Sequence, residues 1–352
     1  MTPNGIAKLT AATAIATVLA GILYASHNSW SAGVVTGEPV LPALANRVGD
    51  IAAIRLEQAG RSLTLKRGDG DAWGIEERGG YPVRPEKVRQ LLLALGEARL
   101  VEPKTRAADK YALLELDDPA GKDAKSRAVR LLAKDGRALG EIVVGKSAPE
   151  AFGAGKGGVY VRKPGDPQSW LADKAPEVTL AVRDWVERSI LVLDAAKQKQ
   201  LTLAQEGGEA PIVVKAKLKD GKADGFEFGE AIPEGKKAKS EGLADGIARA
   251  FGILDLEDVR KAVAPAAGDT VQKATLETSD GMTIAFDLVR DKDAGWLSLA
   301  ASGTADAVKE QVAAIGKRAA GWQFKLPAST VEQLFKTRAD LYEVVEKDKE
   351  KK

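Results

Sequence analysis

The chain has 352 residues, of which 44% are hydrophobic and 29% charged, a balance typical of globular proteins with room for two ordinary domains. Its 52 basic and 50 acidic side chains nearly cancel and alternate along the sequence, so no basic face for nucleic acid is indicated. The chain contains no cysteine and a single histidine. This inventory excludes a thiol nucleophile and zinc sites built from cysteine or histidine.

Residues 9–25, LTAATAIATVLAGILYA, form a stretch of seventeen residues without a charge, directly after Lys8. As a helix they would extend roughly 26 Å, near the ~30 Å of a bilayer core. We expect residues 1–25 to be an uncleaved signal-anchor, a single transmembrane helix spanning Leu9–Ala25. A cleaved signal peptide and a buried helix of a soluble protein are the alternatives, although the one passable cleavage site follows Ser31.

Lysine and arginine flank this stretch unequally. Lys8 precedes it, and the next basic residue after it is Arg47. The positive-inside rule therefore predicts a cytoplasmic N-terminus, with the bulk of the chain outside. The expected location is the inner (cytoplasmic) membrane, with a single pass and the bulk facing the periplasm. Residues 26–48 would be a tether, because Ser, Asn, Gly and Pro recur there.

Residues 49–196 have the pattern of a first α+β domain. Alternation with period two predicts strands over residues 51–58 and 62–67. An apolar stripe then predicts a helix that begins at Pro85, which suits a first helical turn. The stripe consists of Val88, Leu91, Leu92 and Leu95.

The rest of this domain is predicted as strands with one hairpin and two helical segments. Asp135-Gly136 suits the tight turn of the hairpin. The expected strands are 72–77, 99–103, 127–133, 137–145 and two within 157–173, with a helical turn within 109–119 and a closing helix over 177–193.

The same pattern restarts after residue 196. Leu201 takes the place of Ile54, and the hairpin residue Leu276 lies 145 residues after Leu131. Strands are expected at 200–205, 212–214 and 226–228, a helix over 241–254, and a hairpin turn at Asp280-Gly281. Elements of matching type in matching order indicate an internal duplication. We predict two tandem α+β domains of mostly antiparallel sheet, 49–196 and 197–345, followed by a charged tail at 346–352.

Three short motifs suggest chemistry, and each has a simpler interpretation. Gly140–Ser147, GEIVVGKS, satisfies the Walker A pattern, but Glu-Ile-Val-Val has the composition of a strand and no helix start follows. Phe152–Tyr160 could form an anion-binding nest around Lys156, and we favour a loop between strands. Asp117-Asp118 could bind a cation, although a carboxylate pair before proline is ordinary turn chemistry.

Catalytic machinery is not evident elsewhere in the sequence. His27 lies in the tether, so no Ser-His-Asp triad can form in the globular part. Paired-carboxylate catalysis stays open, but nothing singles out two of the 50 acids. Tryptophans could line a sugar-binding face, although core packing is their default role; they are Trp73, Trp170, Trp185, Trp296 and Trp322. We assign no catalytic, cofactor-binding or metal-binding residue and expect no cofactor.

Two pairs of segments carry a resemblance to a known family. They are residues 81–105 followed by YALLELDDP at 111–119, and residues 159–173 followed by RDWVERSIL at 183–191. These stretches resemble the bacterial domain of unknown function 4340 family, strongly over Ile51–Asp194 and more weakly over Lys197–Tyr342. The resemblance implies a membrane-anchored extracytoplasmic protein that accompanies an ABC-type transporter of the gliding-motility-associated kind. It supplies no catalytic residues to carry over.

The sequence thus predicts a non-enzymatic accessory or binding subunit of an ABC-type transport system, with the transporter permease of the inner membrane as its partner. A carboxylate-based hydrolase of envelope polysaccharide and a structural envelope scaffold are the alternatives. Two carboxylates about 5–10 Å apart in a deep cleft would favour the hydrolase. An apolar groove or patch at the interface of the repeats would favour the binding subunit.

Overall fold

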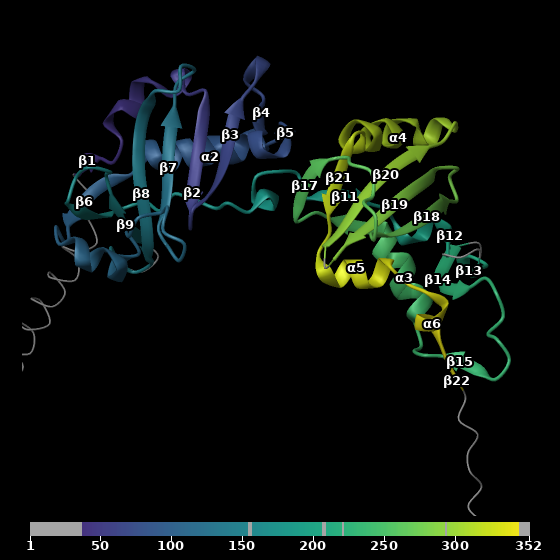
Figure 1. Cartoon of the computed structure of the whole chain (residues 1–352). Helices are drawn as coiled ribbons and strands as arrows, with labels where there is room; N and C mark the ends of the chain where they lie inside the picture. The colour runs from purple at the N-terminus through teal and green to yellow at the C-terminus, as the bar shows by residue number, and fades with distance from the viewer. Residues whose placement is uncertain (1–36, 154–156, 206–208, 220–221, 293, 345–352) are drawn as a thin grey trace, which may run out of the picture. The chain divides into compact units, whose positions relative to one another are not determined.

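The computed structural model describes residues 37–344 except 154–156, 206–208, 220–221 and 293 (Figure 1). The expected anchor at Leu9–Ala25, His27 and the charged tail at 346–352 lie outside these residues. Among the helices that the structure describes, none is both long enough and apolar enough to span a bilayer.

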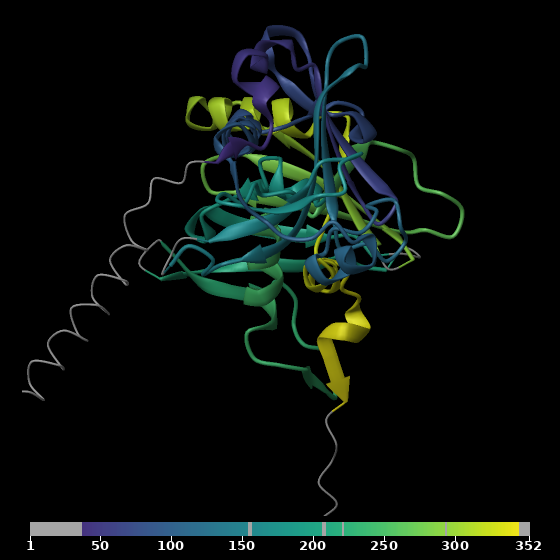
Figure 2. The same cartoon turned by 90° about the vertical axis from the view of Figure 1, so that its left-hand side faces the viewer.

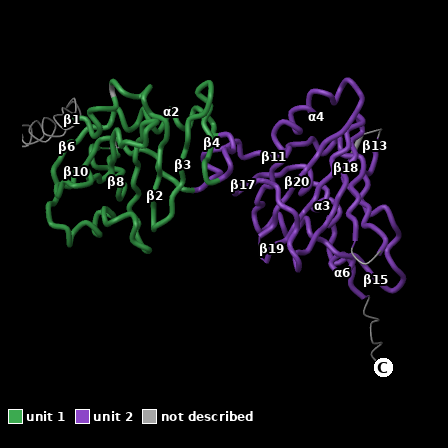
Figure 3. The backbone as a smooth tube through the Cα atoms, turned by 45° about the horizontal axis from the view of Figure 1, so that its top comes forward, with its two compact units in different colours: residues 1–77, 83–180 green, residues 78–82, 181–352 purple. Residues whose placement is uncertain are grey.

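The chain divides into two compact units (Figure 3). The first comprises residues up to Glu77 together with Val83–Leu180, and the second comprises Arg78–Pro82 and the chain from Ala181 onward. The sequence placed the division after residue 196. Residues 181–196 group with the second unit because strand β11 (Ser189–Val192) pairs with β16 (Ile253–Asp255).

The sheet of the first unit runs in the order β1-β6-β10-β9-β8-β7-β2-β3-β4. Neighbouring strands in this order pair antiparallel, as the sequence predicted. The strands are β1 Glu38–Pro39, β2 Ala53–Gln58, β3 Arg61–Arg67, β4 Trp73–Ile75, β6 Arg99–Pro103, β7 Arg127–Leu132, β8 Ala138–Ala148, β9 Gly158–Arg162 and β10 Ser169–Ala172. The two-residue strand β5 (Tyr81–Pro82) is grouped with the second unit.

Helix α2 (Pro85–Glu97) covers one face of this sheet, behind β7, β2 and β3 in Figure 1. It begins at Pro85, as expected, and the predicted apolar stripe is its buried face.

The described residues of the two units also form short 3₁₀-helices. These are η1 Pro42–Asn46, η2 Val48–Asp50, η3 Asp69–Asp71, η4 Glu76–Arg78, η5 Ala108–Leu114, η6 Val182–Asp184 and η7 Ala195–Lys197.

The second unit repeats the strand order of the first. Its eight-stranded sheet runs β14-β13-β12-β18-β19-β20-β21-β17, which corresponds position by position to β4-β3-β2-β7-β8-β9-β10-β6. The strands are β12 Gln198–Leu203, β13 Ile212–Lys219, β14 Lys222–Phe228, β17 Asp258–Lys261, β18 Thr270–Thr278, β19 Thr283–Asp291, β20 Ala294–Ser302 and β21 Trp322–Lys325. A duplicated module accounts for this shared order.

The strand register in the two sheets agrees with the residue equivalences between the two halves of the chain that we inferred from the sequence. In the first unit, Ile54 lies opposite Leu65 on one side and Leu131 on the other, and all three are buried. The second unit has the same arrangement in a row formed by Leu201, Val214 and Leu276. Because a slip by one residue would turn each row to the opposite face, burial fixes the register in both sheets.

Helices distinguish the second unit from the first. Helix α3 (Leu243–Gly252) follows β14 as α2 follows β4, and helix α4 (Asp306–Ala319) packs on β20. Helix α4 was not predicted from the sequence; it lies between β20 and β21, where the first unit has a turn containing Gly165 between β9 and β10. Two short helices follow, α5 Ala328–Leu334 and α6 Arg338–Leu341. Strand β22 (Tyr342–Val344) then pairs with β15 (Lys236–Ala238) below the sheet in Figures 1 and 2.

The closing helix predicted over residues 177–193 was wrong. This segment contains one 3₁₀ turn, η6, followed by β11. Val182, Trp185 and Val186 are all buried, so their helical spacing reflects burial in an irregular segment. Isoleucine and valine in β11 favour an extended backbone once β16 supplies a pairing partner, which local sequence does not reveal.

Helix α2 offers a matched test of this packing. Leu95 is 1% exposed and Leu93 is 58% exposed, on the same helix. Leu95→Ala should destabilise the protein by about 3 kcal/mol because it leaves a cavity in the core, whereas Leu93→Ala should cost less than about 0.5 kcal/mol. Urea denaturation of the full-length protein followed by circular dichroism measures both. Equal losses for the two variants would contradict the orientation of α2.

Candidate functional site

From the sequence, we interpreted the Walker A match at Gly140–Ser147 as part of a strand and not as a phosphate-binding loop. The structure confirms this interpretation. The whole motif lies within strand β8, paired on both sides with β7 and β9. Its glycines serve packing: a Cβ at Gly145 would come within 2.3 Å of the carbonyl oxygen of Leu114, and one at Gly140 within 3.3 Å of Leu41. The motif thus offers no loop whose amides could surround a phosphate.

The described residues of the other two motifs, Asp117-Asp118 and Phe152–Tyr160, have structural roles. The carboxylate of Asp118 accepts a hydrogen bond from the Ala120 amide at 3.0 Å, which is the predicted turn chemistry. Lys156 lies outside the described residues, and the part of its stretch from Gly158 onward belongs to β9. Across the described ranges, no cluster of three or more metal-ligating side chains occurs.

The five tryptophans are divided between the two units, two in the first and three in the second. Trp73 and Trp185 are buried, which confirms core packing for these two. Trp185 was expected in a helix and instead follows η6. On the second unit, Arg260 stacks on Trp296 at 3.9 Å and Lys261 lies 3.5 Å from the ring centre of Trp322. These cations occupy the ring faces that a sugar would need.

An apolar cavity lies in the first unit, along α2. We call it the α2 groove; its volume is about 470 Å³. Its apolar walls are Leu44, Val48, Trp73, Pro85, Val88, Leu92, Leu93 and Gly96, and its charged rim is Arg67, Asp71, Arg89 and Glu97. A concave apolar site with a few polar groups at its edge is the usual form of a binding pocket.

Several separate segments build the α2 groove. Helix α2 contributes Val88 and Leu92 from its buried stripe and Leu93, which is 58% exposed. Helix η1 contributes the buried Leu44, which packs beside Gly96 of α2; a Cβ at Gly96 would make an ordinary van der Waals contact with it at 3.6 Å. Another wall is Trp73 on β4.

The part of the predicted tether that the structure describes, residues 37–48, is folded. It forms β1 and η1 and begins η2, and it buries Val40, Leu41 and Leu44. The spacing of Leu44 and Val48, four residues apart, was the available signal for a helical turn with an apolar side. It was missed because Pro, Gly and Asn surround it.

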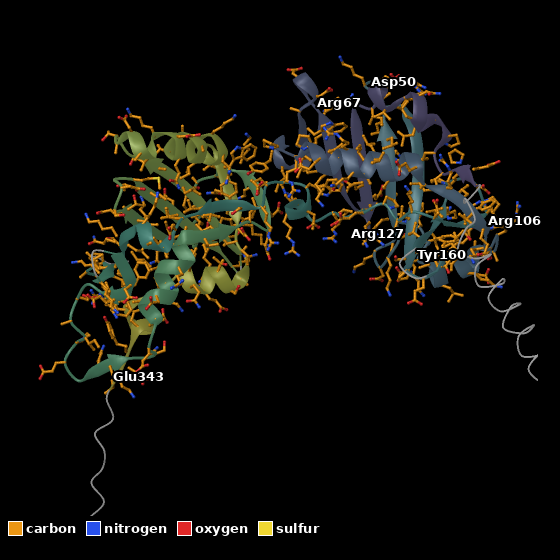
Figure 4. All side chains as sticks on the ribbon, turned by 180° about the vertical axis from the view of Figure 1, so that it is seen from behind. Asp50, Arg67, Arg106, Arg127, Tyr160 and Glu343 are labelled. Atoms are coloured by element: carbon orange, nitrogen blue, oxygen red, sulfur yellow. The ribbon has the colours of Figure 1, made fainter. Side chains whose placement is uncertain are left out.

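Arg67, which is labelled in Figure 4, contacts three segments at the rim of the groove. Its Nη1 donates to the carbonyl of Gly49 at 2.9 Å, its Nε lies 3.4 Å from Asp71 Oδ1, and its guanidinium lies 5.2 Å from the centre of the Trp73 ring. One side chain thus connects η2, η3 and β4. The groove is therefore held open by contacts that need no ligand.

The remaining charges on the rim divide into paired and unpaired groups. Glu97 forms an ion pair with Lys174. Arg89 is exposed, and no ion pair or hydrogen bond of its side chain is found within the described ranges. A second, larger cavity of about 880 Å³ shares Arg67 with the α2 groove. Charged side chains that line it form ion pairs with one another, Arg47 with Asp50 and Lys66 with Glu76, as is usual on a solvated surface.

Replacing Arg67 tests its role at the rim. Arg67→Met removes the hydrogen bond to Gly49 and the stacking on Trp73, so it should cost about 1–2 kcal/mol of stability. Arg61→Met is the control, because Arg61 is an exposed arginine at the start of the same strand. Thermal unfolding measures both variants. The assignment fails if Arg61→Met destabilises the protein as much as Arg67→Met.

Comparison with known proteins places the chain in a family. A family model described as Domain of unknown function (DUF4340) matches residues 73–270, more than half of the chain. The match begins at β4, includes all of α2 and extends through α3 to the start of β18. No curated protein and no solved structure matches the chain. The chain therefore belongs to the family Domain of unknown function (DUF4340).

Proposed function

We propose that this protein is a non-enzymatic, membrane-anchored extracytoplasmic accessory or binding subunit of an ABC-type transport system of the gliding-motility-like kind. The observation that carries the proposal is the α2 groove, a preformed apolar cavity with exposed apolar side chains at its mouth. Its occupant in this proposal is an apolar segment of the extracytoplasmic part of the transporter permease.

The exposed leucine and valine at the groove support a docking role. Leu93 is 58% exposed and Val48 is 41% exposed, and both line the same concavity. Single exposed apolar residues are common on protein surfaces, but a concave cluster of them typically marks a binding site. Covering apolar surface gains about 25 cal/mol per Å². A volume of about 470 Å³ suits one or two large anchoring side chains of a partner.

The carboxyl groups give the hydrolase alternative little support. Such an enzyme needs a carboxylic acid whose pKa is raised, so that it stays protonated at neutral pH. Among the described residues, the carboxyl groups whose pKa moves clearly all move downward, because each accepts hydrogen bonds; they are Glu86, Asp135, Asp280 and Asp340. The acids of the α2 groove, Asp71 and Glu97, lie at its rim in ion pairs with Arg67 and Lys174.

Co-purification from solubilised membranes tests the partner. The wild-type protein should recover an ABC-type permease that is identified by mass spectrometry. Leu93→Glu should lower that recovery by about tenfold or more, because a carboxylate would enter an apolar contact. Leu113→Glu is the matched control, since Leu113 is 72% exposed on η5 of the same unit. Absence of any permease, or equal recovery with both variants, would refute the proposed contact.

A reporter fusion tests the membrane topology. Alkaline phosphatase joined after Lys352 requires an oxidising compartment to form its disulfides. The fusion should be active in cells that carry the full chain and inactive when residues 1–25 are deleted. Activity that survives the deletion would show that these residues are not the export segment.

A further inference from the structure

A second cavity lies within the second unit, apart from the α2 groove. We call it the β19–β22 cavity; its volume is about 480 Å³. It is bordered by the ends of β12, β18 and β19 and by the segment from Phe335 to Tyr342, which leads from α5 to β22. Its walls combine cationic and aromatic side chains, among them Arg290, Lys336 and Tyr342.

Two buried hydrogen-bond donors of this cavity have no partner among the described residues. Seven buried side-chain polar atoms are unpaired in the part of the chain that the structure describes. Two of the seven, Arg290 Nε and Tyr342 Oη, belong to residues that line the cavity. A folded protein gains nothing from leaving buried polar atoms unpaired, so two of them in one cavity suggest a ligand that pairs with them.

The Arg290 side chain stacks on an aromatic ring, but no carboxylate among the described residues neutralises its charge. Its guanidinium lies 4.4 Å from the centre of the Phe335 ring, which is itself buried. Among the described residues, no carboxylate forms an ion pair with Arg290. Stacking occupies the face of a guanidinium and leaves its N–H groups free at the edge, where a planar arginine can bind two oxygens of one anion.

Tyr342 supplies a second donor. It is 6% exposed, its ring packs against Phe228 at 6.0 Å, and its hydroxyl has no partner among the described residues. Burial raises the pKa of this hydroxyl, with the carboxylate of Glu230 adding to the effect. The group therefore stays protonated at neutral pH and can donate a hydrogen bond to an anion.

The charges that line the cavity are mostly positive. Four cationic side chains face one carboxylate, that of Glu209; the cations are Lys236, Arg290, Lys336 and Arg338. Arg338 is paired with Glu230 at 2.7 Å, which leaves an excess of more than one positive charge. This excess matches a multiply charged anion better than a single carboxylate.

The backbone beneath these groups is fixed before any ligand arrives. The carbonyl of Lys336 accepts hydrogen bonds from the side-chain amides of Gln205 and Gln272, each at 3.3 Å. These two bonds join the segment after α5 to β12 and β18. A site whose donors are already positioned loses less entropy on binding.

We propose that the β19–β22 cavity binds the phosphate group of an anionic ligand. Arg290 and the hydroxyl of Tyr342 donate hydrogen bonds to the phosphate oxygens, and Lys336 adds charge. Phosphate offers three acceptor oxygens and up to two negative charges, which corresponds to the donors and the excess charge found here. Its source is either a soluble phosphate ester or the headgroup of an anionic lipid, two cases that share this chemistry.

Isothermal titration calorimetry of the full chain in a non-ionic detergent tests the proposal. The probes are inorganic phosphate, glycerol phosphate and dihexanoyl phosphatidylglycerol, with dihexanoyl phosphatidylcholine and sodium chloride at matched ionic strength as controls. Tighter binding of glycerol phosphate would identify a soluble ester, and tighter binding of phosphatidylglycerol would identify a lipid headgroup. Absence of saturable binding for every phosphate probe, or equal competition by chloride, would overturn the proposal.

Two variants and one control locate the site. Arg290→Gln should weaken phosphate binding by about 100-fold and Tyr342→Phe by about 10-fold, while Arg249→Gln, at an exposed position of α3, should leave it unchanged. Without phosphate, Tyr342→Phe should unfold at the same temperature as the wild type or higher, because it removes an unpaired buried hydroxyl. Wild-type affinity in both Arg290→Gln and Tyr342→Phe would refute the assignment.

Discussion

The central row of buried aliphatic side chains across each sheet is the constraint on which the rest of the structure depends. Ile54 between Leu65 and Leu131 in the first unit, and the corresponding row through Leu201 in the second, place alternate residues of every neighbouring strand in the core. Each row fixes the pairing of two consecutive strands, β2–β3 or β12–β13, with a strand that is distant in sequence, β7 or β18. Helices α2 and α3 can then cover a face whose residues are already determined.

The two units use this common framework for different surfaces. In the first, η1 approaches α2 at Gly96, and the space between them is the apolar α2 groove. In the second, the chain continues beyond the sheet through α5 and α6 to β22, and it encloses a cavity with excess positive charge. Duplication of a fold thus leaves the sheet in place, while the segments added at its edges determine what each unit can bind.

Two arginines show how binding sites differ from structural contacts. Arg67 is stacked on Trp73 and also donates to the carbonyl of Gly49, so its contacts stabilise the rim of the groove. Arg290 is stacked on Phe335 in a similar way, and the Nε of each arginine lacks a hydrogen-bond partner among the described residues. The difference is that Arg67 also has Gly49 and Asp71 as partners, whereas no carboxylate among the described residues pairs with Arg290, so its charge is left for a ligand.

Local pattern in the sequence determined the elements, the antiparallel class and the equivalence of the two halves. Alternation gave strands β2 and β3, Asp135-Gly136 gave the β7–β8 hairpin, and the stripe beginning at Val88 gave α2, because period and turn chemistry are properties of neighbouring residues. Tertiary structure alone decided the rest. Strand β11 is extended because β16 supplies a strand partner, and both cavities combine residues from distant elements, as with Leu44 and Leu93 or Arg290 and Tyr342. Burial and charge at such sites depend on contacts across the fold, which no local pattern of residues contains.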